Sequence, residues 1–229
     1  MGIKEKILQI NKELPPSTKL VAVSKFKPAE AIMQAYEAGQ RVFAESRPQE
    51  LKLKAESLPK DIQWHFIGHL QTNKIKMVVP YTKLIHSIDS ERLLLEVADY
   101  SKKHGYHTDI LLELFIAQEE SKQGFSADEI LDLFDRVSSD PHLQERLSSV
   151  TFKGLMGMAS FVDDETQIRA EFSKITSLMG EIKKRSYPFL NNFSELSFGM
   201  SGDYHIAAQM GSTMVRIGTS IFGDRNYNQ

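Results

Sequence analysis

The chain has 229 residues, of which 41% are hydrophobic and 25% are charged, and its formal net charge is −2. This composition is that of an ordinary globular protein, and the near-neutral charge argues against a nucleic-acid-binding protein. The chain contains no cysteine, which excludes disulfides, thiolate nucleophiles and Cys-ligated metal sites. The length suits one large α/β domain, and we expect a single domain over residues 1–229.

The first ten residues are typical of an amphipathic helix rather than of a targeting signal. Ile3, Ile7 and Ile10 fall on or near one face of this helix, together with Leu8. No apolar signal region follows, and no stretch approaches the ~18 consecutive apolar residues of a membrane span. We therefore expect a cytoplasmic protein without a membrane segment.

From residue 19 onward, short apolar runs alternate with helical patterns. The strand candidates are residues 19–25, 41–45, 63–67, 83–88, 109–116, 154–158, 195–198 and 214–217. The helix candidates are residues 28–38, 47–58, 74–79, 90–104, 126–137, 164–185 and 204–209. Eight strand–helix units without a linker favour a single (β/α)8 TIM-type barrel. An open doubly wound sheet is the alternative, but no glycine-rich turn follows the first strand.

The first strand candidate ends on a lysine. Residues 20–24 form a run typical of a buried strand, and Lys25 follows at its C-terminal end. Such a lysine usually reaches into water, but a barrel places its active site at the C-terminal ends of its strands. We therefore expect the residues that follow the strands to share one mouth, namely Lys25, Glu45, Gly68, Ser160, Ser201, Gly218 and Thr219.

The loops after the last two strands combine glycines with hydroxyl side chains, at residues 199–203 and 218–220. Barrels often bind phosphate with these two loops, because glycine lets backbone N–H groups approach an anion and hydroxyls add donors. A lysine and a phosphate site are the minimum for holding pyridoxal phosphate as a Schiff base. Arg216, inside the last strand, either pairs with a carboxylate and braces the barrel or donates a hydrogen bond to a cofactor ring nitrogen.

The histidines do not form a metal site by their spacing. His65 alternates with apolar neighbours and is predicted to be a core histidine, whereas His69 lies beyond the strand and near the mouth. Asn73 is predicted to cap the following helix. His104 and His107 flank a glycine turn and are expected at the surface.

Six motifs, spread over nearly the whole chain, match one known family. They are VAVSK (21–25) with Pro28, FAES (43–46) with Gln49 and Glu50, WHFIG (64–68) continuing to Lys74, GLM (154–156), LSFGMS (196–201) and GSTMVRIGTSIFG (211–223). On these motifs the chain resembles the pyridoxal phosphate homeostasis protein family, whose fold is similar to the barrel domain of bacterial alanine racemase. One departure is Ser46, which stands where many members have Asn, so Ser46 is only a weak candidate for a cofactor contact.

The resemblance implies a cofactor and a set of residues to bind it. Lys25 would carry pyridoxal 5′-phosphate as a Schiff base, and Arg216 would face the pyridine nitrogen. The residues implied for the phosphate are Ser197, Ser201, Gly218 and Thr219, with Met200 contributing its backbone. The family is thought to bind, buffer and pass on the vitamin B6 cofactor, so apo-enzymes that need this cofactor are the implied partners.

Three functions remain open at this point. The first is a carrier or regulator of pyridoxal phosphate with little or no catalysis. The second is a pyridoxal-phosphate-dependent amino-acid racemase or lyase. A racemase needs two bases, and besides Lys25 only Tyr204 and Tyr227 are candidates. In alanine racemase a separate β domain of the partner subunit supplies that tyrosine, and this chain ends at Gln229, so we expect no such domain and favour the first function.

The third function is a phosphate-binding barrel without a covalent cofactor, such as a sugar-phosphate isomerase. Such a barrel would use Lys25 as an electrostatic clamp or as a Schiff base to its substrate. It lacks a clear general base, because Glu45 is the only carboxylate at a strand end with a good claim. No long exposed apolar helix stands out, so we expect a monomer.

Overall fold

Eight parallel strands close into a barrel in sequence order, and the last strand pairs with the first. The computed structural model describes residues 1–117 and 123–223. The strands are β1 (Lys19–Val23), β2 (Val42–Glu45), β3 (Gln63–Phe66), β4 (Leu84–Ile88), β5 (Thr108–Glu113), β6 (Val150–Met156), β7 (Glu195–Ser197) and β8 (Met214–Ile217). The predicted (β/α)8 architecture is therefore confirmed, and each strand candidate overlaps a strand. The bounds were wrong above all for two candidates, since the strand predicted at 109–116 ends at Glu113 and the strand predicted at 154–158 begins at Val150 and ends at Met156.

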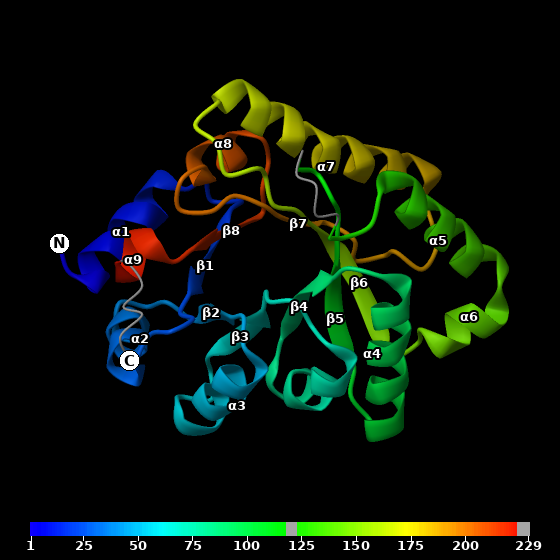
Figure 1. Cartoon of the computed structure of the whole chain (residues 1–229), viewed down its shortest axis with the longest axis horizontal. Helices are drawn as coiled ribbons and strands as arrows, with labels where there is room; N and C mark the ends of the chain where they lie inside the picture. Colours follow the sequence, from blue (N-terminus) through cyan, green and yellow to red (C-terminus); the bar gives the residue numbers. More distant parts are fainter. Residues whose placement is uncertain (118–122, 224–229) are drawn as a thin grey trace.

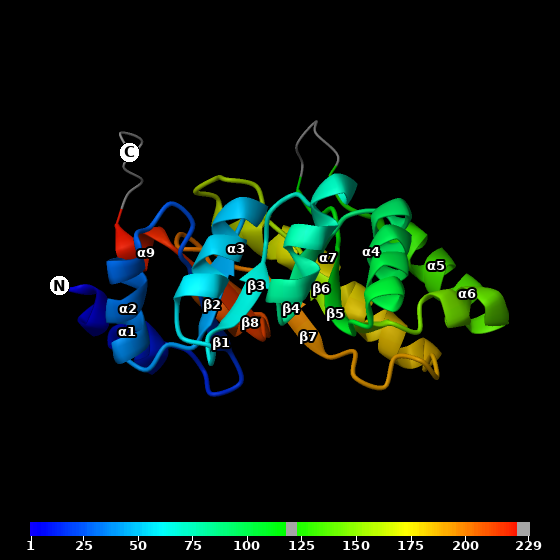
Figure 2. The same ribbon diagram turned by 90° about the horizontal axis from the view of Figure 1, so that it is seen from below.

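Helices surround the strands as an outer ring, which Figure 1 shows along the shortest axis of the molecule and Figure 2 shows edge-on. The α-helices are α1 (Ile3–Glu13), α2 (Ala29–Glu37), α3 (Pro48–Ser57), α4 (Glu91–His104), α5 (Ala127–Ser139), α6 (Pro141–Arg146), α7 (Glu165–Arg185), α8 (Tyr204–Gln209) and α9 (Thr219–Phe222). None of the helices in the described ranges combines the length and the apolar character needed to cross a membrane.

The prediction of a helix at residues 74–79 was wrong in type. This segment forms two short 3₁₀ helices, η1 (Thr72–Met77) and η2 (Val79–Tyr81). Pro80 lacks an N–H donor and disfavours the α conformation of the residue before it, so the turns do not join into one α-helix. Asn73 lies inside η1 and caps nothing, because the N-cap position belongs to Gln71.

Side-chain alternation along the strands divides the core into two layers. Between strands and helices lies a large apolar layer that contains the fully buried rings of Phe43, Phe66, Phe134, Phe172 and Phe198. Inside the barrel lies a smaller cluster, formed by Val21, Val23, Ala44, Leu84, Leu111, Met156 and Met214. Burial of apolar surface in both layers drives folding, at about 25 cal/mol per Å².

Polar side chains also lie inside the barrel. His65, His86, Ser197, Arg216 and Glu113 are all at least 95% buried. Polar groups are expensive to bury unless they are hydrogen-bonded, so these residues are the exceptions that the packing of the barrel does not explain.

Candidate functional site

A cavity of about 410 Å³ opens at the C-terminal mouth of the barrel. Of the seven predicted cofactor residues, six line it: Lys25, Met200, Ser201, Arg216, Gly218 and Thr219. Ser160 lines the cavity as well. The prediction that these residues share one mouth is therefore confirmed for them, whereas Glu45 and Gly68 do not line the cavity.

Lys25 lies in a turn whose two flanking residues are both held by hydrogen bonds. The preceding residue, Ser24, donates its hydroxyl to Glu45 Oε1 at 2.6 Å. The following residue, Phe26, donates its backbone N–H to Glu50 Oε1 at 2.8 Å and has a left-handed backbone, with φ of 62°. A non-glycine residue in this conformation carries strain, so the surrounding contacts must determine it. The turn that presents Lys25 is thus held in one shape.

Glu45 belongs to the hydrogen-bond network that holds this turn and does not face the mouth. Because Ala44 points into the barrel, Glu45 points outward, where it is fully buried. Lys54 Nζ of α3 donates to Glu45 Oε1 at 2.8 Å, to Glu50 Oε1 at 2.6 Å and to the Ser24 carbonyl at 2.8 Å. Burial raises the pKa of Glu45 to about 7, and the Lys54 charge opposes that rise. The prediction that Glu45 faces the mouth was therefore wrong.

The turns after β7 and β8 meet at a glycine–hydroxyl cradle, formed by Ser201, Gly218 and Thr219. The backbone N–H groups of Gly218 and Ser220 point to Ser201 Oγ across 3.4 and 3.5 Å. Bonds of this length are weak, so an incoming anion can take over both donors. A Cβ atom at Gly218 would lie 3.2 Å from the carbonyl oxygen of Val23, which leaves little room for a side chain. The cradle therefore fits a phosphate group.

Arg216 lies in the wall of the cavity and is 4% exposed. Its Nη1 donates to the carbonyl and hydroxyl oxygens of Ser197, both at 2.7 Å, and its Nη2 donates to the Gly157 carbonyl at 3.0 Å. Burial lowers the pKa of Arg216 to about 10, and the charges of Glu113 and Asp203 oppose that shift. Within the described ranges, its hydrogen bonds go to carbonyl and hydroxyl oxygens rather than to a carboxylate, which does not match the bracing alternative.

Ser197 lies behind Arg216 rather than in the cavity. Its side chain is fully buried, and its Oγ forms a second hydrogen bond, to His86 Nδ1 at 2.9 Å. The phosphate-binding role implied for Ser197 stays a prediction. The sequence showed no sign of its link to His86, because the two residues are 111 positions apart.

Glu113 was missed by the sequence analysis. It ends β5 and is 3% exposed, and its Oε2 has no hydrogen-bond partner among the described residues. Burial raises the pKa of Glu113 to about 7; the Asp89 charge raises it further, and the Arg216 charge opposes the rise. A smaller cavity of about 220 Å³ contacts Glu113 and shares Met158, Phe161 and Met200 with the main cavity.

One wall of the main cavity is apolar. It is formed by Met156, Met158, Phe161, Val162 and Ile168, and the Phe161 ring at its rim is 96% exposed. The base of this segment is fixed, because Ser160 donates its backbone N–H and its hydroxyl to Glu171 at 2.7 and 2.8 Å. The cavity thus combines a cationic and hydroxyl-rich side with an apolar side, as small-molecule sites do.

Four further residues considered as candidates lie outside the cavity. His69 is exposed and pairs with Asp89 at 3.0 Å, and Asn73 lines a surface groove beside α4. Gly68 packs against Ser46, since a Cβ on Gly68 would overlap the Ser46 carbonyl. His65 is a buried core histidine, as predicted.

Of the two tyrosines proposed as second bases, Tyr204 does not line the cavity. Tyr204 donates its hydroxyl to Glu13 Oε2 of α1 at 2.7 Å, and burial together with this bond raises the pKa of Tyr204. Tyr227 lies outside the described residues. No tyrosine of residues 1–117 or 123–223 lines the cavity.

Known proteins resemble this chain over nearly its full length. The model of the family "alanine racemase, N-terminal domain" matches residues 2–226. The pyridoxal phosphate homeostasis protein of Vibrio cholerae is 36% identical over 218 residues, covering 93% of this chain and 88% of that protein. The Homo sapiens protein of the same name is 35% identical over 239 residues, covering 99% of this chain and 84% of that protein.

Solved structures agree with these matches. PipY of Synechococcus elongatus, solved with PLP bound, has a TM-score of 0.84 and 32% identity, covering 96% of this chain and 100% of that one. Alanine racemase of Bartonella henselae has a TM-score of 0.71 at 13% identity and covers 99% of this chain and 60% of that one, which shows a common fold. The chain therefore belongs to the alanine racemase N-terminal domain family and, within it, to the pyridoxal phosphate homeostasis proteins.

Proposed function

We propose that this protein binds pyridoxal 5′-phosphate as a Schiff base on Lys25 and serves its homeostasis as a carrier or regulator, with little or no catalysis. One observation carries the proposal: Lys25 and the glycine–hydroxyl cradle line one cavity, although they come from opposite ends of the sequence. The names of the relatives and the PLP-bound PipY structure support the choice of cofactor.

Different residues of the cavity bind the aldehyde and the phosphate of the cofactor. The cofactor supplies an aldehyde, and the Lys25 amine is the group that condenses with it. Ser201, Gly218 and Thr219 hold the phosphate through hydroxyl and backbone N–H donors, and the Met200 backbone belongs to the same turn.

Arg216 faces the pyridine nitrogen in this proposal. A guanidinium only donates hydrogen bonds and stays protonated, so it favours an unprotonated ring nitrogen. An unprotonated ring is a poorer electron sink, which restrains carbanion chemistry. Arg216 therefore suits a protein that keeps the cofactor rather than one that uses it.

A single observation favours the racemase or lyase alternative. Glu113 on β5 lies across the closed barrel from Lys25, which follows β1, and burial raises the pKa of Glu113 to about 7, near that of a working general base. Its Oε2 is enclosed, however, and Glu113 contacts the smaller cavity rather than the main one. Solvent deuterium exchange at the α-carbon across a panel of amino acids decides this point, and we expect none.

The first test is the visible spectrum of the protein incubated with pyridoxal phosphate, followed by borohydride reduction and peptide mass mapping. We expect a Schiff-base band and a reduced phosphopyridoxyl group on Lys25, both lost in Lys25→Ala. Lys27→Ala is the matched control, because Lys27 lies in the same turn and its Nζ instead donates to the carbonyls of Phe222 and Gly223. A colourless, unmodified protein would refute the proposal and favour the phosphate-binding barrel without a covalent cofactor.

We also propose a cytoplasmic monomer that passes its cofactor to apo-enzymes. The mouth of the cavity is open at Phe161, so the cofactor can enter and leave without a large rearrangement. Transfer is tested by mixing the loaded protein with an apo-enzyme that requires pyridoxal phosphate and following the gain of activity, against free cofactor at the same concentration.

A further inference from the structure

A column of hydrogen bonds runs through the interior of the barrel and ends at Arg216. We call His65, His86, Ser197 and Arg216 the polar column. Arg216 Nη1 lies 2.7 Å from Ser197 Oγ, Ser197 Oγ lies 2.9 Å from His86 Nδ1, and His86 Nε2 lies 2.9 Å from His65 Nδ1. Its members come from β3, β4, β7 and β8, and each is at least 95% buried.

The direction of every hydrogen bond in the polar column follows from Arg216. A guanidinium has only donors, so Ser197 Oγ accepts from it. Among the described residues His86 Nδ1 is the hydrogen-bond partner left to accept the Ser197 hydroxyl proton, so we assign that proton to the bond with His86. A neutral His86 that accepts at Nδ1 carries its proton on Nε2, which donates to His65 Nδ1. His65 in turn carries its proton on Nε2. No bond in the column is left without a proton, and none has two.

This assignment requires both imidazoles to be neutral, and their surroundings keep them so. Burial lowers the pKa of His86 well below its usual value, and the charge of Arg216 acts in the same direction. Burial lowers the pKa of His65 to about 3, and the positive charges of Lys19 and Lys83 act in the same direction. Both rings are therefore neutral at physiological pH.

The polar column restricts how the Arg216 guanidinium can turn. Both Nη1 protons go to Ser197, one to its carbonyl and one to its hydroxyl, and one Nη2 proton goes to the Gly157 carbonyl. The Nε–H group and the second Nη2–H group lie on one edge of the guanidinium and remain for other acceptors. Because Arg216 lines the cavity, a ligand bound there can supply these acceptors. Rotation of the guanidinium would break three hydrogen bonds in a buried site, where an unpaired polar group costs the most.

We propose that Ser197 and His86 are positioning residues, which hold the Arg216 guanidinium so that its remaining N–H donors face the ligand in the cavity. The inference rests on the proposed function only in the choice of pyridoxal phosphate as the probe. It gives Ser197 a role other than the phosphate contact that the family resemblance implies. The ligand atom that meets Arg216 is a hydrogen-bond acceptor, because a guanidinium offers nothing but donors.

The test compares two substitutions of His86. Asn places an amide oxygen near the position of Nδ1 and can accept the Ser197 proton, whereas Leu cannot. We expect His86→Leu to bind pyridoxal phosphate about 10-fold more weakly and to shift the visible absorption maximum of the bound cofactor, and His86→Asn to restore both. Leu84→Ala is the matched control, since Leu84 lies two residues away in the interior cluster and makes no polar contact.

The control separates positioning from a merely structural role. Leu84→Ala should lower stability while keeping affinity and absorption maximum. If His86→Leu behaves in the same way as Leu84→Ala, the inference is overturned. If the wild-type protein itself takes up no pyridoxal phosphate, the proposed function has failed, and the inference is then decided by the NMR measurement that follows.

Nitrogen-15 NMR measures the histidine tautomers and the rotation of the Arg216 guanidinium in the polar column without any ligand. We expect neutral Nε2–H tautomers for His65 and His86 between pH 6 and 8, and separate, slowly averaging Nη signals for Arg216. In His86→Leu the Arg216 signals should average, and in His86→Asn they should stay separate. An Nδ1–H tautomer or a charged ring at His86, or freely averaging Arg216 signals in the wild type, would overturn the inference.

Discussion

At the scale of single residues, the carboxyl group of Glu113 is buried with little to compensate its charge. It is 3% exposed, its Oε2 has no partner in the described part of the chain, and Arg216 opposes its rise in pKa only through space. Such a group is tolerated more easily when protonated, because burial penalises the charged form. Its protonation therefore couples the stability of the fold to pH.

The sign of that coupling follows from the pKa of Glu113, which is about 7 in the folded protein and 4.5 as its ordinary value. A raised pKa means that the stability due to this group is complete below pH 4.5 and is lost as the pH rises through 7. We expect Glu113→Gln to match the wild type at about pH 4, below the ordinary pKa of the carboxyl, and to be more stable at pH 8, by at most about 3 kcal/mol. Urea unfolding at both pH values measures the difference.

The control for this prediction is Glu5→Gln on the exposed side of α1, which changes the net charge equally but removes no buried carboxyl. A Glu113→Gln protein that is less stable than the wild type at pH 8 would contradict the prediction. Glu45 has a pKa shift of the same sign, so the Glu113→Gln protein should keep part of the wild-type pH dependence.

Residue types alone pointed to Lys25 and Arg216 but not to Glu113 or His86. Lys25 and Arg216 are unusual in any apolar strand, so their sequence context is enough to single them out. Glu113 was hidden because the predicted strand ran to residue 116, which placed it in the middle of the strand rather than at its end. His86 and Ser197 acquire their role only from pairing across the barrel, which requires the register of four strands.

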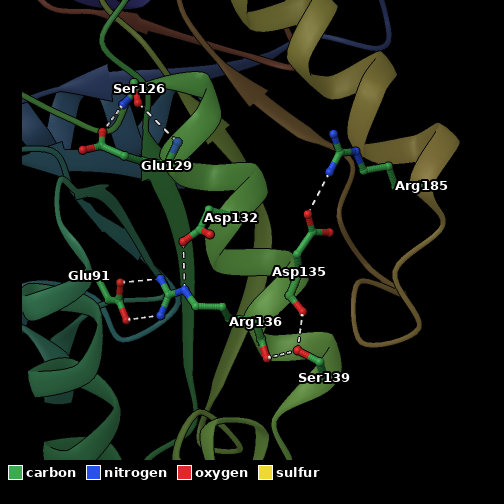
Figure 3. Close-up of polar contacts among 8 residues, drawn as sticks. All are labelled: Glu91, Ser126, Glu129, Asp132, Asp135, Arg136, Ser139 and Arg185. Carbon is green, nitrogen blue, oxygen red and sulfur yellow. Dashed lines mark hydrogen bonds and ion pairs between the residues drawn. The ribbon is translucent and has the colours of Figure 1, made fainter.

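At the scale of elements, α5 shows how a helix in the outer ring is fixed at its start and along its side (Figure 3). Ser126 and Glu129 form a reciprocal capping box at its first turn. Arg136 makes a bidentate contact with Glu91 of α4, at 2.9 and 2.7 Å, and also contacts Asp132 at 2.8 Å. The cap satisfies helix N–H groups that would otherwise lack partners, whereas the ion pairs are largely exposed.

This difference predicts unequal effects of two substitutions on α5. Ser126→Ala should lower the free energy of unfolding by about 1 kcal/mol, because the N-cap acceptor is lost. Asp132→Asn should change it by less than about 0.5 kcal/mol, because an exposed pair within one helix contributes little. Denaturant unfolding compares the two variants, and an equal or reversed ranking would contradict this account.

The sequence predicted most elements, and it failed where they are short. The helix start at Ser126 and the glycine that ends α4 at Gly105 are local signals, and both are present in the structure. The helices that were missed, α6 and α9, are six and four residues long, although α8, which is also six residues long, was predicted.

At the scale of the whole molecule, the closed barrel gives each strand of residues 1–117 and 123–223 two neighbours, so none of the strands β1–β8 leaves an edge for another chain to pair with. This feature supports the monomer that we propose. Light scattering on the purified protein should give a mass near 26.0 kDa. Twice that mass, persisting at low micromolar concentration, would contradict it and would reopen the question of whether a partner subunit completes the site.

Closure between β1 and β8 also has a consequence for synthesis of the protein. The ribosome makes Lys25 early, but Arg216, Gly218 and Thr219 are among the last described residues to appear. In the function that we propose, the Lys25 amine is therefore made before the cradle that would hold the phosphate of the cofactor. A nascent chain cannot close the proposed site until β8 has left the exit tunnel, so loading with pyridoxal phosphate would follow the synthesis of β8.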